Sequence, residues 1–285
     1  MKAVIITGVS TGIGYSSAKL LIESGYHVFG SIRTQEDASR LSVEFGKNFS
    51  PLIFDVTDEI AINNSVKIVE DKLGNNGKLV CLINNAGIAL GGPVLHLDIN
   101  TFRKQFEVNL FSIVTITKAF SKLLGATKDS IHQGKIINIS SVAGKRAFPF
   151  SGPYSASKHA LEGLSDSLRI ELKLYGIDVI LVEPGPVVTN IWDKLPDPNN
   201  NEFIGTDYEP SLVNFYNHIK EISDIGLPVE VVSNKIKHII ENPKPKVRYV
   251  LTRQKFKNYW LPKILSTRIY DNIVAKFLGI KKEPN

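Results

Sequence analysis

The chain has 285 residues, of which 43% are hydrophobic, and a formal net charge of +6. This length can bury one large core, and because no Pro-, Gly- or Ser-rich linker or internal repeat divides the chain, we expect a single domain with an extension. The single cysteine excludes a disulfide within the chain, and the six histidines fall in no ligand spacing, so no metal site is expected.

The first predicted elements are a strand at residues 2–6, a glycine-rich turn and a helix. Residues 7–14 read Thr-Gly-Val-Ser-Thr-Gly-Ile-Gly. Gly8 permits a tight turn, Gly12 lets backbone N–H groups approach a pyrophosphate, and Gly14 lets the helix pack on the strand. The spacing differs from the commoner G-x-G-x-x-G, so a plain glycine-rich turn is the alternative to a dinucleotide site.

The second strand, expected at residues 26–32, ends in a basic residue. NAD sites usually place Asp or Glu here, where it binds the ribose 2′-hydroxyl and repels a 2′-phosphate. Arg33 follows this strand, no carboxylate occurs before Glu36, and a guanidinium fork suits a phosphate. Candidate hydroxyl donors are Ser10, Thr11, Ser31 and Thr34. The sequence therefore favours NADP(H); NAD(H) stays possible if Arg33 only lies on a solvated surface.

Further strands and helices alternate along the chain. Helices are expected at residues 36–45, 58–73 and 106–124 and from Tyr154 onward, and strands at residues 51–54, 79–83, 135–139, 177–182 and 247–251. This alternation predicts an α/β protein with a doubly wound parallel sheet (Rossmann fold), helices on both faces and ligands at the carboxyl ends of the strands. Cys81 lies in an apolar strand, which favours a buried inert thiol over a catalytic one.

Tyr154 and Lys158 lie four residues apart at the start of a helix with apolar residues at helical spacing, so they share one helix face. An ammonium held near a phenol favours the phenolate and lowers the phenol pKa. The pair therefore suits a proton relay, although a tyrosine and a lysine at this spacing also occur on ordinary amphipathic helices.

In its motifs the chain resembles the short-chain dehydrogenase/reductase family over about the first 190 residues, in particular its retinol- and hydroxysteroid-dehydrogenase-like members. Six motifs follow the family's order: the glycine turn at residues 7–14, Asn84-Asn85-Ala86-Gly87, Asn109, Ser141, the pair Tyr154 and Lys158, and Pro184-Gly185-Pro186-Val187-Val188-Thr189. The resemblance implies the fold and the reaction type, and says less about the substrate.

The resemblance implies four catalytic residues. Tyr154 would protonate the substrate oxygen during reduction and take the proton back during oxidation, while Ser141 would hydrogen-bond that oxygen. Lys158 would hold the nicotinamide ribose and lower the Tyr154 pKa. Ser141 is preferred to its neighbour because relatives place the catalytic serine thirteen residues before the tyrosine. Asn109 would support a water chain to Lys158; alternatively, it satisfies local backbone groups.

The resemblance also implies the residues that contact the cofactor. Pro184 and Gly185 would bend the chain beneath the nicotinamide ring, and Thr189 would hold its carboxamide. Asp55 would contact the adenine amino group, or cap the following helix instead. The expected cofactor-binding residues are Gly8, Ser10, Thr11, Gly12, Ile13, Gly14, Arg33, Asp55, Val56, Asn85, Ala86, Gly87, Tyr154, Lys158, Pro184, Gly185, Val187 and Thr189.

A variable segment at about residues 190–227 carries aromatic residues among loop-forming residues, as a substrate lid would. The alternative is a capping helix with ordinary core aromatics. With a lid, an apolar pocket is expected, lined by Leu90, Val142, Phe148, Phe150 and Trp192. Such a pocket favours a bulky apolar alcohol or ketone, of the retinoid, steroid or long-chain acyl type, over a sugar.

The C-terminal tail carries the positive charge of the protein. Residues 244–285 hold 11 Lys/Arg and 2 Asp/Glu, a net charge of +9, whereas residues 1–243 hold 23 and 26, a net charge of −3. Apolar residues recur at helical spacing, so a basic amphipathic helix is expected within an extension at residues 255–285, following a catalytic domain at residues 1–254. This helix could lie on an anionic membrane, or pack on the protein's own pocket or on a neighbouring subunit.

The expected function is an NADP(H)-dependent oxidoreductase that transfers hydride between nicotinamide and a carbonyl or alcohol. The alternative is a nonenzymatic NADP(H)-binding sensor on the same fold. The N-terminus enters the first strand directly and no apolar run can span a membrane, which predicts a cytoplasmic protein. Relatives commonly pair the helices at residues 106–124 and after Tyr154, so a homodimer or homotetramer is expected, and no nucleic-acid partner.

Overall fold

The computed structural model describes residues 1–189, 202–253, 255, 259–260 and 264–281. Within these residues seven strands form one sheet: β1 (Lys2–Ile6), β2 (His27–Ile32), β3 (Phe49–Ile53), β4 (Lys78–Asn84), β5 (Lys135–Ile139), β6 (Asp178–Pro184) and β7 (Arg248–Leu251). Their order is β3-β2-β1-β4-β5-β6-β7, and every neighbouring pair is parallel. The predicted doubly wound parallel sheet is confirmed.

The order of the strands reverses between β1 and β4. β1 pairs with β2 on one side, in the register Ala3 to His27, and with β4 on the other, with a shift between Ala3 and Val4. Residues 3–6 are completely buried, because this central strand is covered on both faces. In open parallel sheets, ligands bind at the carboxyl ends of the strands beside such a reversal.

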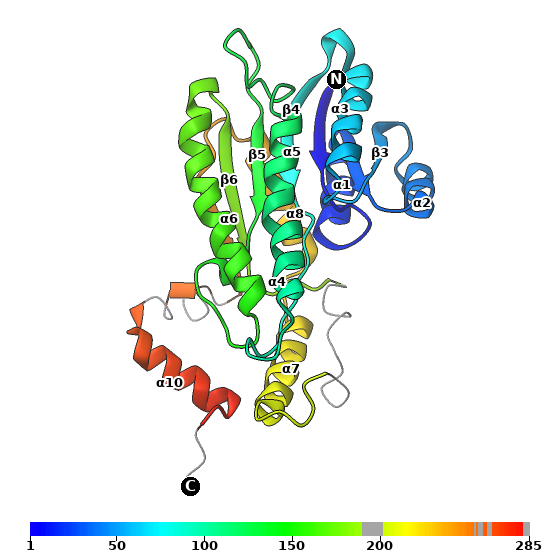
Figure 1. Ribbon diagram of the computed structural model, residues 1–285. Helices are drawn as coiled ribbons and strands as arrows, with labels where there is room; N and C mark the ends of the chain where they lie inside the picture. Colours follow the sequence, from blue (N-terminus) through cyan, green and yellow to red (C-terminus); the bar gives the residue numbers. More distant parts are fainter. Residues whose placement is uncertain (190–201, 254, 256–258, 261–263, 282–285) are drawn as a thin grey trace.

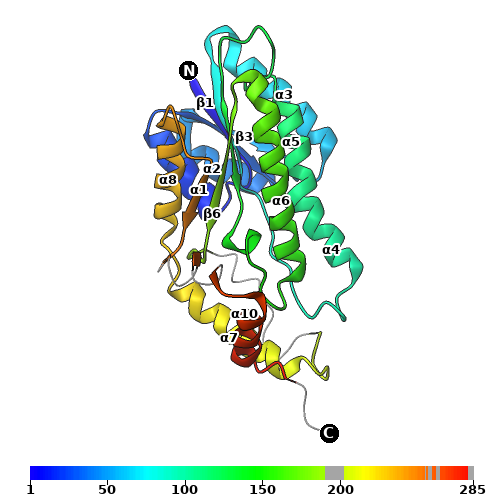
Figure 2. The ribbon, with the colours of Figure 1, turned by 90° about the vertical axis from the view of Figure 1, so that its left-hand side faces the viewer.

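Helices cover both faces of the sheet (Figures 1 and 2). One face carries α1 (Gly12–Glu23), α2 (Gln35–Phe45) and α8 (Val229–Glu241), and the other carries α3 (Glu59–Leu73), α4 (Ile99–Phe106), α5 (Ser112–Phe120) and α6 (Gly152–Glu171). Short 3-10 helices lie at Gly46–Asn48, Gly74–Asn76, Val142–Gly144 and Leu172–Tyr175. Each face has its own apolar core, and the sheet separates the two.

The helix expected at residues 106–124 differs from the one observed. A π-helical segment, Glu107–Phe111, joins α4 to α5, and α5 ends at Phe120. A π-turn inserts one extra residue into a helix, and such turns occur frequently at functional sites. Asn109 lies in the middle of this segment and is fully buried.

A third apolar cluster lies beyond the carboxyl ends of the strands, where α7 (Glu209–Asp224) and α10 (Thr267–Leu278) are found (Figure 1). Its buried residues are Phe150, Phe203, Leu212, Phe215, Tyr216, Val274 and Leu278. In the described part of the expected lid, the aromatic residues therefore pack as core residues of a capping helix. Trp192 and the rest of residues 190–201 lie outside the described residues.

The tail helix, expected to span residues 255–278, is interrupted at Leu265 and Ser266. α10 begins at Thr267, because Leu265 and Ser266 are not helical and Ser266 has the extended backbone of an N-cap residue. On its inner face Val274 and Leu278 pack against α7. This contact corresponds to the alternative in which the tail packs on its own subunit. The division of the chain at residues 254/255 stays a prediction.

Candidate active site

The glycine turn has the geometry that its sequence predicts. Gly8 and Gly12 have positive φ angles of 71° and 61°, which a side chain would strain. A Cβ added to Gly14 would lie 2.1 Å from the carbonyl oxygen of Gly8, so only glycine fits where α1 meets the turn. Thr11, the N-cap of α1, makes no side-chain capping bond within the described part of the chain, and the first turn holds no acidic residue. The N-terminus of α1 can therefore receive an anion.

The segment that directly follows β4 holds this turn in place. Asn85 Nδ2 donates to the carbonyl oxygens of Thr7 and Gly8, at 2.8 and 3.1 Å. The backbone N–H groups of Asn85 and Ala86 both donate to Thr7 Oγ1, at 2.9 Å. The Asn85 amide nitrogen thus stabilises the turn. A direct contact between residues 85–87 and a cofactor would use atoms other than this nitrogen. Thr7 was not predicted, because its role depends on a strand distant in sequence.

Two arginines lie where β2 ends. Arg33 is exposed and its charge helps to lower the pKa of Asp37 and Asp55. Arg40, on α2, donates through Nη2 to the Ser10 carbonyl oxygen at 3.3 Å and to Asp37 at 2.7 Å. Its hydrogen bond is the main cause that holds the pKa of the Asp37 carboxyl below its usual range. Sequence reasoning missed Arg40; its position on α2, seven residues after Arg33, was the available signal.

Asp55 does not cap α3. Its Oδ1 accepts hydrogen bonds from the Thr57 backbone N–H at 2.9 Å and from the Thr57 hydroxyl at 2.7 Å. The N-cap of α3 is Asp58, which accepts from Ala61 N–H at 2.9 Å. The capping alternative for Asp55 is therefore wrong, because the helix starts three residues later than that role requires.

Four predicted cofactor residues have apolar side chains that pack into the two cores. Ile13 and Val187 contact the core under α1 and α8, and Val56 and Ala86 contact the core under α3 and α5. Val187 also forms an isolated β-bridge with Leu227. Their backbone atoms are available for contacts with a cofactor.

Ser141 and Tyr154 lie close enough for the Ser141 hydroxyl to lower the Tyr154 pKa. Ser141 follows β5, is 8% exposed, and caps the 3-10 helix Val142–Gly144 by accepting from Ala143 N–H at 3.1 Å. Its Oγ also donates to the Pro184 carbonyl oxygen at 3.4 Å, which links it to the end of β6. Tyr154 lies in the first turn of α6 and is half-buried. The two hydroxyls can therefore meet one oxygen atom of a bound molecule.

Lys158 lies one turn further along α6 and is buried. Its Nζ donates to the Ile139 carbonyl oxygen at 2.8 Å and lies 5.9 Å from the centre of the Tyr154 ring. Burial lowers the pKa of this amine to about 8, while the charge of Glu162 acts in the opposite direction. A Cβ added to Gly87 would lie 3.9 Å from this Nζ and 3.3 Å from Asn109 Oδ1, so these predicted residues converge.

The structure corrects the expected pKa of Tyr154. Burial raises this pKa above its usual value, and the hydrogen bond with Ser141 only partly offsets that rise. The expectation of a lowered Tyr154 pKa is therefore wrong for this structure, because burial disfavours the phenolate and is the largest cause of the shift. A phenol that stays protonated at neutral pH is suited to donating a proton.

Asn109 uses its side chain to fix the loop after β4. Its Oδ1 accepts from Ile88 N–H at 2.9 Å, and its Nδ2 donates to the Ile88 carbonyl oxygen at 3.0 Å and to Ser157 Oγ at 3.2 Å. The side chain is thus fully engaged locally, as the alternative interpretation expected. If Asn109 supports a water chain to Lys158, it must do so through the backbone of the π-helical segment.

The nicotinamide end of the expected site lies close to the glycine turn. A Cβ added to Gly12 would lie 3.4 Å from Thr189 Cγ2, so the start of α1 and the segment after β6 face each other. Gly185 N–H donates to the Leu251 carbonyl oxygen at 2.8 Å, which fixes that segment to β7. Among the described residues other than glycine, only Phe150, between Ser141 and Tyr154, has a positive φ, of 62°. Strain of this kind clusters at functional sites.

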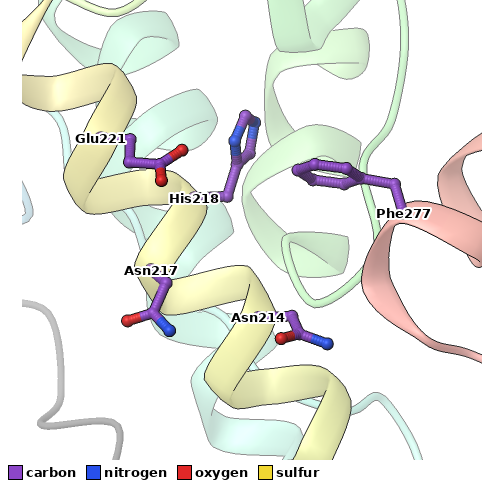
Figure 3. Close-up of a pocket in the computed structure, with 5 residues that line it drawn as sticks. All are labelled: Asn214, Asn217, His218, Glu221 and Phe277. Carbon is purple, nitrogen blue, oxygen red and sulfur yellow. The ribbon is translucent and has the colours of Figure 1, made fainter.

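A separate pocket lies between α7 and α10, lined by Asn214, Asn217, His218, Glu221 and Phe277 (Figure 3). His218 stands edge-on to the Phe277 ring, with 4.8 Å between ring centres, and burial lowers its pKa. Of the described residues predicted for the active site, none lines this pocket. This pocket lies at the contact between α7 and α10.

Two further features concern the described part of the chain only. It contains no group of three or more His, Cys, Asp and Glu side chains placed to hold a metal ion. Burial raises the pKa of the Cys81 thiol, so this thiol is inert.

Comparisons with known proteins agree with this geometry. The family model described as short chain dehydrogenase matches residues 2–200. The NADPH-dependent 3-dehydrocapnine reductase of Ornithobacterium rhinotracheale is 41% identical over 278 residues, which cover 98% of each chain. The solved structure of ElxO with NADP bound is 27% identical with a TM-score of 0.70, covering 88% of this chain and 96% of that one. A short-chain dehydrogenase from Streptomyces avermitilis has the same fold, with a TM-score of 0.75 at 24% identity, over 98% of this chain and 95% of that one.

Proposed function

The chain belongs to the short-chain dehydrogenase/reductase family and is an oxidoreductase, and from this premise we propose that it is an NADPH-dependent reductase of a ketone on a bulky, largely apolar substrate. The observation that carries the proposal is the convergence of Ser141, Tyr154 and Lys158 beside the glycine turn at the carboxyl ends of the strands. The relative with 41% identity is named as a reductase, which supports the reductive direction.

NADP(H) is the preferred cofactor. The relative with 41% identity is named as NADPH-dependent, and ElxO was solved with NADP. The residues present fit this cofactor: the turn leaves no room for a side chain at Gly14, α1 presents an uncapped N-terminus, and two arginines lie after β2. The paired oxygens of a 2′-phosphate suit the guanidinium groups of Arg33 and Arg40.

The bound nicotinamide would supply the hydride, and the residues of this chain would manage the proton and the charge. As negative charge grows on the substrate oxygen, the hydroxyls of Tyr154 and Ser141 would stabilise it, because both are positioned in advance. Tyr154 would give its proton to that oxygen. Lys158, cationic below about pH 8, would favour the resulting phenolate and bind the ribose hydroxyls.

The substrate class follows from the capping elements. Phe148 and Phe150 lie on the loop between Ser141 and Tyr154, and both belong to the apolar cluster under α7 and α10. A substrate that reaches Ser141 from this side meets aromatic rings. We therefore propose a ketone with a long or bulky apolar body; 3-dehydrocapnine, the substrate in the name of the relative with 41% identity, is one candidate, and retinoids and steroids are others.

The competing function is a nonenzymatic sensor that binds NADP(H). The presence of Ser141, Tyr154 and Lys158 together favours the enzyme, since a sensor has no use for them. Oxidation of NADPH should be followed by absorbance with 3-dehydrocapnine and with apolar ketones of other classes. Turnover of at least one ketone is expected; tight NADPH binding without turnover of any would favour the sensor.

Replacing Arg33 with alanine should weaken binding of NADPH far more than binding of NADH. Loss of one charge-assisted phosphate contact corresponds to roughly a tenfold to hundredfold change in Kd for NADPH. The Kd for NADH should change less than threefold. Titrations of both cofactors measure this, with Lys47→Ala, a basic residue beyond α2, as the control. Equal losses for both cofactors would mean that Arg33 does not read the phosphate.

The outer surface of the α4, α5 and α6 layer supports a homo-oligomer. Phe111, Val114, Ile170 and Leu174 are exposed on it, each by more than a third. Large apolar side chains exposed on an outer helix layer support an interface with another copy of the chain. We expect a dimer or tetramer in light scattering at micromolar concentration, and a species of only 31.6 kDa would contradict the proposal.

The cytoplasmic location and the peripheral membrane contact stay predictions. The described helices include none that is long and apolar enough to cross a membrane. On α10, Ile269, Ile273 and Phe277 are each more than half exposed and follow one another at helical spacing, which supports contact with a lipid surface. Co-sedimentation with vesicles containing anionic lipid, at low and high salt, tests this contact.

A further inference from the structure

Arg146 lies in the loop that carries the proposed active-site serine. It follows Ser141 by five residues and precedes α6. Five residues of chain span at most about 18 Å, so the Arg146 backbone is within the length of an extended lipid-like molecule from the Ser141 backbone. The guanidinium group rests on the Tyr270 ring of α10, with 3.9 Å from its Cζ to the ring centre.

Two donors of this guanidinium have no partner. Arg146 Nε and Nη2 are shielded from solvent, yet neither has a hydrogen-bond partner among the described residues. Stacking on Tyr270 uses the face of the guanidinium and leaves Nε and Nη2, which lie in its plane, unsatisfied. Nε–H and the adjacent Nη2–H point the same way and form the side of the fork that binds an oxyanion with two parallel hydrogen bonds. A donor that is shielded from solvent and has no hydrogen-bond partner destabilises the folded state, so these two donors need an explanation.

The nearby carboxylates are engaged elsewhere. Glu162 pairs with Lys145 at 2.7 Å and with Arg248 at 3.2 Å, and Asp166 pairs with Arg248 at 2.6 Å. Within the described part of the chain, Arg146 has no ion pair, although its neighbour in sequence, Lys145, has one. The charge of Arg146 is therefore available to a ligand.

The surroundings of Arg146 are apolar on the side of the capping helices. Phe148 and Tyr270 pack against the cluster that Phe150 and Phe215 form. α10 is held there by Val274 and Leu278 and by a hydrogen bond from Asn214 Nδ2 to the Leu278 carbonyl oxygen at 3.1 Å. A ligand that satisfies Arg146 must thus combine an anionic group with an apolar body, and it must displace the Tyr270 side chain or α10 to reach the donors.

We propose that Arg146 binds an anionic group of the substrate through Nε and Nη2, so that the substrate is an anionic amphiphile: an apolar chain with a carboxylate, sulfonate or phosphate. The proposal rests on the proposed function for the ketone and adds the head group. Arg146 would then favour ketones that carry an anionic group over neutral ones. Tyr270 would hold the guanidinium in position by stacking against it.

The test compares ketones that differ only in the head group. Long-chain oxo carboxylates, sulfonates and phosphonates, with the ketone placed at several distances from the head group, are assayed against neutral esters of the same chain length, with wild type and Arg146→Met. We expect kcat/KM for anionic ketones to fall about 10- to 100-fold in the variant, and kcat/KM for neutral ketones to change less than threefold. Arg268→Met, which removes the same charge from an exposed position on α10, should behave as wild type. Arg146→Gln serves if Arg146→Met does not fold, as judged by circular dichroism.

A binding measurement separates this inference from the proposed function. Calorimetry with decanoate, decyl sulfonate and decyl phosphate against decanol, in the presence of NADP+, needs no turnover. Tighter binding of the anions to wild type, lost in Arg146→Met, supports the inference even if no ketone is reduced. Equal binding of anions and decanol to wild type, or equal losses for anionic and neutral ligands in the variant, would overturn it and leave the reductase proposal intact.

Discussion

Tyr154→Phe should reduce kcat/KM for ketone reduction by about a thousandfold or more, while Kd for NADPH changes less than threefold. General acid catalysis contributes roughly 10²–10⁴-fold, and this substitution removes the one hydroxyl that would supply the proton. Ser141 would remain hydrogen-bonded to the Pro184 carbonyl oxygen, so the loop should keep its shape. Steady-state kinetics and cofactor titration measure the two quantities.

Tyr175→Phe provides a matched control for Tyr154→Phe. It removes the same hydroxyl from a half-buried tyrosine that packs against the core under α3 and α5, away from Ser141. This variant should retain wild-type kcat/KM. A Tyr154→Phe variant whose activity stays within a few-fold of wild type would remove Tyr154 from the proton path.

Gly14→Ala should disrupt the glycine turn. The new Cβ would lie 2.1 Å from the Gly8 carbonyl oxygen and 2.6 Å from Asn85 Nδ2, and the first of these atoms is backbone, which cannot rotate away. We expect the free energy of unfolding to fall by about 2 kcal/mol or more, and the affinity for NADPH to fall at least tenfold, because the turn must open to admit the methyl group. Thermal denaturation and cofactor titration give both values.

Gly163→Ala is the control for Gly14→Ala. Gly163 lies inside α6, and a Cβ there would meet no atom within 4 Å. Alanine should therefore raise the free energy of unfolding by about 0.5–1 kcal/mol through its better helix propensity, and leave NADPH affinity unchanged. If both variants behave alike, the close approach of α1 to the turn is not what requires glycine.

The sequence predicts the fold well where local pattern determines structure. β1 and β5 have the predicted bounds, because short apolar runs rich in β-branched residues between polar turns are typical of buried parallel strands. The glycine turn was also predictable, since the requirement for Gly8 and Gly12 is conformational and belongs to those residues alone.

Features that depend on contacts between residues distant in sequence were predicted wrongly or missed. The tail helix was expected to begin near residue 255, yet Ser266 interrupts it, and the inner face of α10 is set by α7, which no local pattern reveals. Thr7 and Arg40 were missed because their partners lie on other elements. The direction of the Tyr154 pKa was wrong because burial depends on the packed structure.

The buried lysine has a consequence for the stability of the whole protein. The folded state binds the Lys158 proton less tightly than the unfolded chain, since burial lowers the pKa from 10.5 to about 8. Below pH 8 both states are protonated, and the folded state carries the full penalty, on the order of 3 kcal/mol. Between pH 8 and 10.5 the unfolded chain holds more protons, so this group makes the folded state more stable as pH rises. Binding of NADP(H) to the folded state would add to the free energy of unfolding, so the protein should resist unfolding and proteolysis longer with the cofactor than without it.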